Sequence, residues 1–209
     1  LVNNGNIDLS QFLMGASGQQ IINGTGSIST FVTFNLNGGI NLGGDQTINT
    51  LLNFNYGLIH TGPHKIVIAP GATVQNNSGT ELYVDGNLEM NMPLGSFGYT
   101  WRVGDSTGYK PIQISLLNVT SPGPLLVSTS QGDHSQLVLS SLIPNKSLNR
   151  TWHIVNNGVT FGSAYVQMYW DAAEVDNLAN TNNFVVGKFD APSTWTYPGV
   201  VNRTATSIQ

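Results

Sequence analysis

The chain has 209 residues, of which 40% are hydrophobic and only 9% are charged, and its formal net charge is -4. Ordinary domains carry about 25% charged residues, and disordered chains pair low hydrophobicity with high net charge, so this composition predicts ordered β-structure. The acidic balance predicts neither a nucleic-acid partner nor an anionic membrane partner. Because cysteine is absent, disulfides, thiol nucleophiles and cysteine-ligated zinc are excluded.

The length is compatible with one large all-β domain or two smaller ones, and a shift in composition near Pro93 favours two. The predicted domains are residues 1–95 and 96–209. All four tryptophans and six of the seven Lys and Arg residues lie in the second domain. No run approaches the roughly 18 apolar residues of a membrane helix, so no membrane insertion is predicted. The missing initiator Met and signal peptide indicate a mature or partial segment of a longer protein.

A recurring unit, a glycine followed by a short alternating apolar run, dominates residues 1–95. Units begin at Gly5 and Gly26, which are 21 residues apart, and at Gly39 and Gly57, which are 18 apart; another begins at Gly86. Such spacings are typical of solenoids, in which each coil covers the apolar face of the next. The unit therefore predicts a short parallel β-helix. A sandwich with tight turns would give similar local patterns and stays open at this point.

The strands of this β-helix are expected at residues 5–9, 26–28, 39–42, 48–54, 57–59, 65–68, 82–84 and 86–90. Alternation places Ile40 and Leu42, and likewise Ile66 and Ile68, on one buried face. Glycine and asparagine between the runs supply residues that tolerate the positive φ of tight corners.

Residues 96–209 alternate again, with strands expected at 99–103, 112–114, 137–139, 152–154, 164–170 and 184–189. Short strands separated by Pro and Gly turns predict an antiparallel β-sandwich. Trp152 and Trp170 are predicted to fill its core, which is the ordinary use of tryptophan in a strand. The helix-like stretch at 171–178 is too short to predict more than a turn.

Three segments carry a family resemblance. Residues 57–74 (GLIHTGPHKIVIAPGATV) and 83–88 (YVDGNL) resemble the "G-x-I-x-T-G-x-x-x-L-x-L, then Y-V-x-G-x-L" rungs of large secreted surface proteins of Bacteroidetes. Residues 101–112 are similar to the "F-P-V-G-x-x-x-x-Y-x-P-V" signature that follows those rungs, although Trp101 and Arg102 replace Phe-Pro. Residues 150–154 and 185–189, with Trp195, resemble the "R-x-W-x-I, V-V-G-R-Y, W" pattern of the closing sandwich.

The resemblance implies a repeat-rich adhesin or filament protein, exported by type IX secretion and held at or beyond the cell surface. It assigns no catalytic residues. It also implies a candidate O-glycosylation site, because residues 105–107 (DST) are similar to the acceptor sequence used by Bacteroidetes, which selects Ser106.

The residues themselves do not predict an enzyme. Lys65 is the only Lys or Arg among the first 98 residues, and a polysaccharide lyase or hydrolase needs paired carboxylates or a calcium cluster with a nearby base. His60 and His64 flank a Gly-Pro turn with no carboxylate close in sequence, so no metal pair is expected. The acids Asp171, Glu174 and Asp176 lack the EF-hand pattern and predict a solvated loop. We therefore expect no catalytic residue, no metal and no cofactor.

Four aromatic residues could stack on sugar rings: Trp195, Tyr197, Trp101 and Tyr109. Trp195 and Tyr197 alternate along one run and would share one side of a strand. These residues support an alternative function, a carbohydrate-binding module of a larger secreted enzyme, with surface glycans as partners. A phage fibre or tailspike segment is a third alternative.

Leu1 and Val2 begin a strand at the open end of the predicted β-helix, where unpaired backbone groups invite another strand. Either a preceding domain continues the coil, or a neighbouring subunit supplies the missing pairing. The main functional hypothesis is therefore a non-catalytic extracellular structural or adhesive module whose partners are copies of itself or neighbouring repeats. Low charge favours such packing, because little repulsion opposes it.

Overall fold

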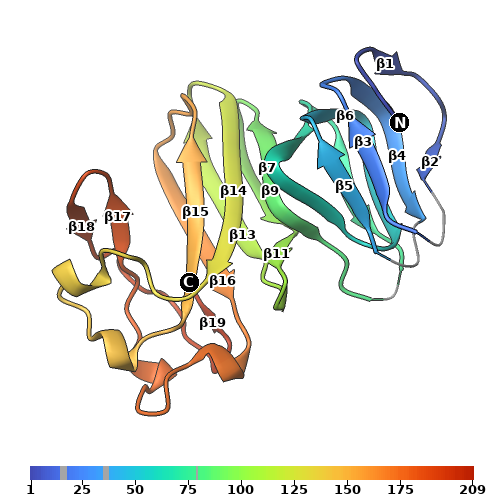
Figure 1. Cartoon of the computed structure of the whole chain (residues 1–209). Coiled ribbons are helices and arrows are strands. Elements are labelled where there is room, and N and C mark those ends of the chain that lie inside the picture. Colours follow the sequence, from blue (N-terminus) through green and yellow to red (C-terminus); the bar gives the residue numbers. More distant parts are fainter. Residues whose placement is uncertain (15–17, 35–37, 79) are drawn as a thin grey trace.

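In the computed structural model, which describes residues 1–14, 18–34, 38–78 and 80–209, the protein is all-β and begins with a parallel β-solenoid (Figure 1). The predicted β-helix is thereby confirmed. Its strands are β1 (Asn6–Ile7), β2 (Phe12–Met14), β3 (Gln20–Asn23), β4 (Ser27–Phe34), β5 (Ile40–Gly43), β6 (Gln46–Tyr56), β7 (Ile59–Ile68), β8 (Thr73–Asn76), β9 (Val84–Met92) and β11 (Val103–Asp105).

The solenoid has three sides, each a ladder of parallel strands. Side one joins β1 to the first part of β4 and of β6, then to the second part of β7 and of β9. Side two joins β3 and β5 to the first part of β7 and of β9, and then to β11. Side three joins β2 to the second part of β4 and of β6, and ends at β8.

The interior is a stack of aliphatic side chains in register. On side one, Ile7 pairs with Ile28, which pairs with Ile48, and the row continues through Ile68 to Met90. Ile28 and Ile48 are fully buried. The predicted burial of Ile40, Leu42, Ile66 and Ile68 is confirmed, because period-two alternation within each strand directs these side chains inward.

The corner between sides two and one is held by polar groups and by glycine. Asn3 Nδ2 donates to Gln46 Oε1 at 2.9 Å, so the first coil is tied directly to the third. Gln46 Nε2 donates to the carbonyl of Gly24 at 2.6 Å. Gly44 lies so close to this carbonyl that an added Cβ would be 1.9 Å from the oxygen of Gly24. Only glycine lets the coils approach this closely.

Antiparallel strands continue the solenoid. β14 (Gly123–Gln131) pairs with β9, and β15 (Arg150–Asn156) pairs with β14, which extends side one by two strands (Figure 1). A four-stranded antiparallel sheet consists of β10 (Gly95–Trp101), β13 (Ile112–Val119), β16 (Ser163–Tyr169) and β19 (Ser207–Ile208). One hydrophobic core runs from the solenoid into these strands. This core and the 13-stranded sheet include strands from both predicted domains, 1–95 and 96–209, and the strand that begins at residue 95, β10, starts the four-stranded sheet.

The segments between β14 and β15 and between β16 and β19 form a lobe with little regular structure. It contains the short 3₁₀ helices η1 (Leu137–Leu139), η2 (Pro144–Lys146), η3 (Ala172–Glu174) and η4 (Thr181–Asn183), and the hairpin of β17 (Lys188–Asp190) and β18 (Thr194–Thr196). β12 (Gly108–Tyr109) pairs with β11 in a separate hairpin. The prediction of a strand at 137–139 is wrong, because η1 turns back on itself through hydrogen bonds three residues apart. The turn expected at 171–178 is present as η3.

We predict that Gly44→Ala lowers the free energy of unfolding by about 1–3 kcal/mol, because the new Cβ would collide with the Gly24 carbonyl. The matched control is Gly5→Ala, whose Cβ would meet nothing within 4 Å and should change stability by less than about 0.5 kcal/mol. Urea unfolding followed by far-UV circular dichroism measures both. Equal losses in the two variants would contradict this account of the corner.

Candidate functional site

The first coil presents a strand edge on which no described residue pairs. Leu1 and Val2 lie along β3: the Leu1 amino group donates to the Ile21 carbonyl at 3.1 Å, and Asn23 N donates to the Leu1 carbonyl at 2.9 Å. Among the described strands, β1 and β2 pair with β4 alone. All these contacts lie on one side of the coil, so its opposite side carries unpaired backbone groups.

Apolar side chains surround this edge. Val2 is 66% exposed, and Leu1, Leu9, Leu13 and Ile21 are also exposed. Single exposed apolar residues are ordinary on protein surfaces, but a group of them beside an unpaired strand edge is typical of an interaction surface. We use the name first-coil edge for the unpaired edge of residues 1–14, which includes β1 and β2, together with the exposed side chains beside it, Leu1, Val2, Leu9, Leu13 and Ile21.

The structure places Trp195 and Tyr197 in the C-terminal lobe, not on an open platform. The Trp195 ring is half-buried, with its centroid 5.2 Å from that of Phe189 and 5.4 Å from that of His134. Tyr197 is 43% exposed, and its hydroxyl accepts a hydrogen bond from Ser141 N at 2.8 Å. Only Tyr197 therefore offers substantial surface to a ligand.

Trp101 and Tyr109 lie elsewhere. Trp101 is fully buried in the core, so neither face of its ring is available for stacking on a sugar. Tyr109 stacks on Tyr83 with ring centroids 5.9 Å apart, and the Arg102 guanidinium covers it at 4.6 Å. Burial raises the pKa of Tyr109 to about 12. The structure thus does not gather the four predicted aromatic residues into one site.

The histidines of the solenoid contact carboxylates on neighbouring coils. His60 Nδ1 lies 2.8 Å from Asp85 Oδ2, and the two residues are partners in the side-two ladder. His64 Nδ1 lies 3.7 Å from Asp45 Oδ1. Across the described parts of the chain, no three His, Asp or Glu side chains are grouped as a metal site would require. The two histidine–carboxylate contacts therefore join neighbouring coils of the solenoid to each other.

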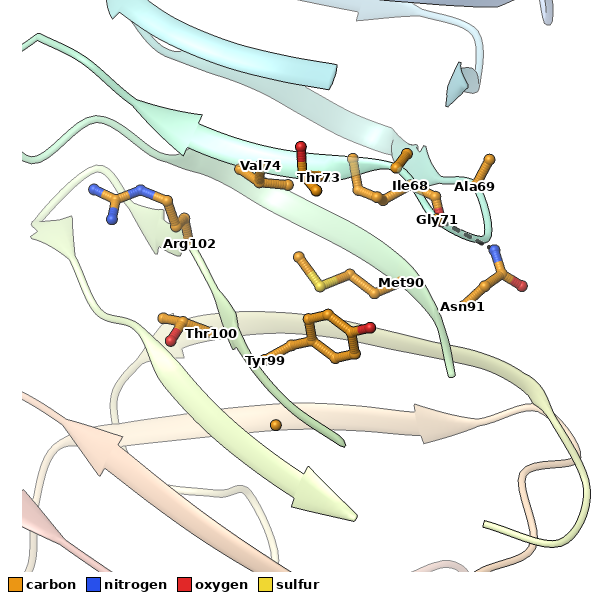
Figure 2. Close-up of a pocket in the computed structure, with 12 residues that line it drawn as sticks. Ile68, Ala69, Gly71, Thr73, Val74, Met90, Asn91, Tyr99, Thr100 and Arg102 are labelled. Atoms are coloured by element: carbon orange, nitrogen blue, oxygen red, sulfur yellow. Dashed lines mark hydrogen bonds between the residues drawn. The ribbon is translucent and has the colours of Figure 1, made fainter. Parts of the chain in front are cut away.

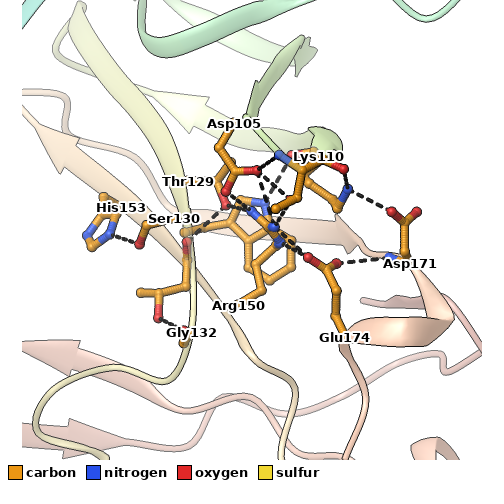
Figure 3. Close-up of polar contacts among 12 residues, drawn as sticks. Asp105, Lys110, Thr129, Ser130, Gly132, Arg150, His153, Asp171 and Glu174 are labelled. Atoms are coloured by element: carbon orange, nitrogen blue, oxygen red, sulfur yellow. Dashed lines mark hydrogen bonds and ion pairs between the residues drawn. The ribbon is translucent and has the colours of Figure 1, made fainter. Parts of the chain in front are cut away.

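A buried polar network centres on Arg150, whose side chain is inaccessible to solvent (Figure 3). Its Nε donates to Glu174 Oε1 at 2.7 Å, and its Nη1 donates to Asp105 Oδ2 at 2.8 Å. Nη1 also donates to Thr129 Oγ1, and Nη2 donates to Thr107 Oγ1. The guanidinium thereby joins β15 and β14 to the β11–β12 hairpin and to η3.

The acids predicted to lie in a solvated loop are partly engaged in this network. Glu174 is buried, and its Oε2 accepts a hydrogen bond from Asp171 N at 3.0 Å. Asp171 is paired with Lys110 at 2.8 Å, and the Lys110 side chain is 1% exposed. Asp176 accepts hydrogen bonds from Ser147 N and from the Asn149 side chain, which lower its pKa. These carboxylates face protein donors.

Ser106 lies exposed at the turn between β11 and β12, next to the Arg150 network. The Thr107 backbone N–H donates to Asp105 Oδ1 at 2.9 Å, which fixes the turn. The position of Ser106 is accessible to a modifying enzyme, and its glycosylation stays a prediction.

A groove of about 380 Å³ lies between β8 and β10 (Figure 2). Val74 of β8, Met90 of β9 and Tyr99 of β10 line its apolar part, and Thr73 and Asn91 are among its polar residues. The groove marks where side three of the solenoid ends, because the next strand, β10, pairs with β13 instead of β8. It brings together no cluster of acids and bases.

The fold defines an all-β protein built on a parallel β-solenoid with an antiparallel extension. No protein-family model, curated protein or solved structure matches the chain. Within the described ranges, no helix is long and apolar enough to cross a membrane.

We predict that Arg150→Met lowers the free energy of unfolding by about 3–5 kcal/mol, because it leaves the buried carboxylates of Glu174 and Asp105 without their cation. Lys188→Met is the control: Lys188 and Asp190 are both exposed, so losing their pair should cost less than about 1 kcal/mol. Urea unfolding at neutral pH compares them. A small effect of Arg150→Met would mean that the network does not hold the lobe.

Stability should also fall in acid. Burial raises the pKa of Asp105, but hydrogen bonds from Arg150 and Thr107 outweigh it, and the net effect lowers this pKa. The unfolded chain therefore takes up a proton more readily than the native protein, so stability is lost as pH falls below about 4. We predict that Asp105→Asn, although less stable at neutral pH, shows a weaker decline in its urea midpoint on acidification. An unchanged decline would contradict this role.

Proposed function

We propose that this protein is a non-catalytic extracellular structural or adhesive module, a repeating unit of a surface adhesin or filament whose units join through strand edges. The observation that carries the proposal is the first-coil edge, where β1 and β2 leave unpaired backbone groups beside exposed apolar side chains. Proteins that remain separate in solution generally cover or charge such edges. Residues 1–14 contain a single charged side chain, Asp8.

The shape of the molecule supports an assembly role. The strands of side one, extended by β14 and β15, form one row, with β1 near one end of the molecule and β15 towards the other (Figure 1). A row of this kind presents two different ends, and repeating units can join end to end. Few charges oppose this contact, since only 9% of the residues are charged.

An extracellular location is part of the proposal. It is supported by the resemblance of residues 57–74 and 83–88 to rungs of Bacteroidetes surface proteins, which also suggests export by type IX secretion. Several titratable side chains are paired within the fold: His60 contacts Asp85, Glu89 contacts Lys65, and Asp105 contacts Arg150, each on a neighbouring strand or loop. This use of titratable groups favours a structural role over a catalytic one.

Glycan recognition is the second candidate function, and the exposed ring of Tyr197, two residues after Trp195 in the sequence, is the observation that favours it. A sugar ring could stack on Tyr197. Glycan-array binding that is lost in Tyr197→Ala and retained in Tyr165→Ala, an exposed tyrosine on β16, would support this function. Absence of binding to every glycan would leave assembly as the role of the module.

We predict that the protein forms filaments or other end-to-end oligomers visible by negative-stain electron microscopy. Val2→Lys should raise the concentration needed for assembly by about tenfold, because a charge at a strand edge opposes pairing. The matched control is Val138→Lys, since Val138 is 74% exposed but lies on η1, far from the first coil in sequence. Dispersed single particles of the wild-type protein at all concentrations would overturn the proposal.

A further inference from the structure

We infer that the first-coil edge binds the β15 edge of a second copy of this chain, in parallel register, with Asn6 of one copy opposite Val155 of the other. The inference rests on the proposed function, because it names the partner of the same edge. It follows from the sheet that joins β1 to β15, which has these two strands as its ends.

An unbroken row of paired residues crosses this sheet. Asn6 pairs with Ser27, which pairs with Thr47, which pairs with Val67. The row continues from Val67 to Glu89, from Glu89 to Leu126, and from Leu126 to Val155. Each residue in the row therefore has the same register in its strand as Asn6 has in β1.

A second row, one residue further along, shows the direction of β15. It begins with Ile7, passes through Ile48, Met90 and Leu125, and ends at Asn156. Residue numbers therefore increase in the same direction on β1 and on β15. The two antiparallel steps, from β9 to β14 and from β14 to β15, reverse the chain twice and restore the direction of the solenoid strands.

A second copy displaced along the row, without being turned over, would present its β1 to β15 as a parallel neighbour. This is the relation that every solenoid strand already has to the next. The outer edge of β15 is open to such a neighbour, since among the described strands β15 pairs with β14 alone. The sheet would then continue from one molecule into the next.

The surfaces at the two edges are compatible. Residues 153–156 are exposed, and Ile154 and Val155 add apolar surface on β15 that matches the apolar surroundings of the first coil. The guanidinium of Arg150 is buried and paired with Asp105 and Glu174, so it presents no free charge. Joining the edges therefore buries apolar groups and satisfies backbone groups without placing like charges together.

The contact is heterologous, because the two copies use different surfaces, and such a contact propagates into a fibre or closes into a ring. The competing arrangement is a two-fold contact in which β15 pairs with β15 of the partner, antiparallel. The two arrangements place different residues opposite each other, and they can be separated by cross-linking.

Disulfide cross-linking can test the pairing without background from native thiols, because the chain contains no cysteine. Two single variants, Asn6→Cys and Val155→Cys, are purified with tags of different size and mixed under mild oxidation. Strands in a sheet lie about 4.8 Å apart, which is within the Cα separation that a disulfide requires. We expect a covalent heterodimer of the two variants, with at least about tenfold more product than in a mixture of Asn6→Cys with Val138→Cys.

Each outcome bears on the inference. Predominant self-linking of Val155→Cys would overturn it in favour of the two-fold contact. Filaments without the heterodimer would overturn this edge pairing while leaving the proposed assembly role intact, whereas the absence of both would overturn the two together. Circular dichroism confirms that each variant is folded before it is mixed.

A second measurement does not depend on disulfide geometry. Val155→Lys should raise the concentration needed for assembly by about tenfold, through the charge it adds to the β15 edge. The control is Val185→Lys, because Val185 is 50% exposed, close to the 48% of Val155, but lies outside the sheet. Equal assembly of Val155→Lys and the wild-type protein would count against the pairing.

Discussion

The register of the side-one ladder is the constraint on which the rest of the structure depends. Each parallel step places an apolar residue above an apolar residue, so that Ile28, Ile48 and Ile68 form one column of the core. A slip by one residue would turn this column to solvent. Asn3 and Gln46 oppose such a slip, since their hydrogen bond joins coils that are not neighbours. The same ladder then carries the register into β14 and β15.

The C-terminal lobe depends on this ladder through Arg150. The residue begins β15, at the end of the extended sheet, and its guanidinium reaches the β11–β12 hairpin and η3. The desolvation of this charge is offset by carboxylates and hydroxyls on three separate segments, all of which must be in place together. The lobe has few regular strands of its own, so the network substitutes for a ladder. Charge pairing at η3 therefore holds the lobe together with backbone hydrogen bonds such as that from Asn149 N to the Glu174 carbonyl at 2.8 Å.

Much of the solenoid could be predicted from the sequence, because burial acts on alternate residues of each strand and leaves a local pattern. β14 was missed, although Leu125, Val127 and Thr129 alternate, since the Gly-Pro that begins it resembles a turn. The Arg150 network leaves no such pattern: Arg150 is 45 residues from Asp105 and 24 from Glu174. The burial of the aromatic residues could not be predicted either, because the sequence alone does not distinguish the buried Trp101 from the exposed Tyr197.

The sequence separation of contacting residues differs between the solenoid and the lobe, and this difference bears on the order in which the two regions fold. Contacts between neighbouring coils join residues about one coil apart, such as Asn6 with Ser27 at 21 residues and Lys65 with Glu89 at 24. Lys110 and Asp171 are 61 residues apart. Short loops close with less loss of entropy than long ones, so a partly formed solenoid can grow from any coil and template the next. Because Arg150 reaches Asp105 and Glu174 across 45 and 24 residues, we expect its network to form only after β15 has joined the ladder.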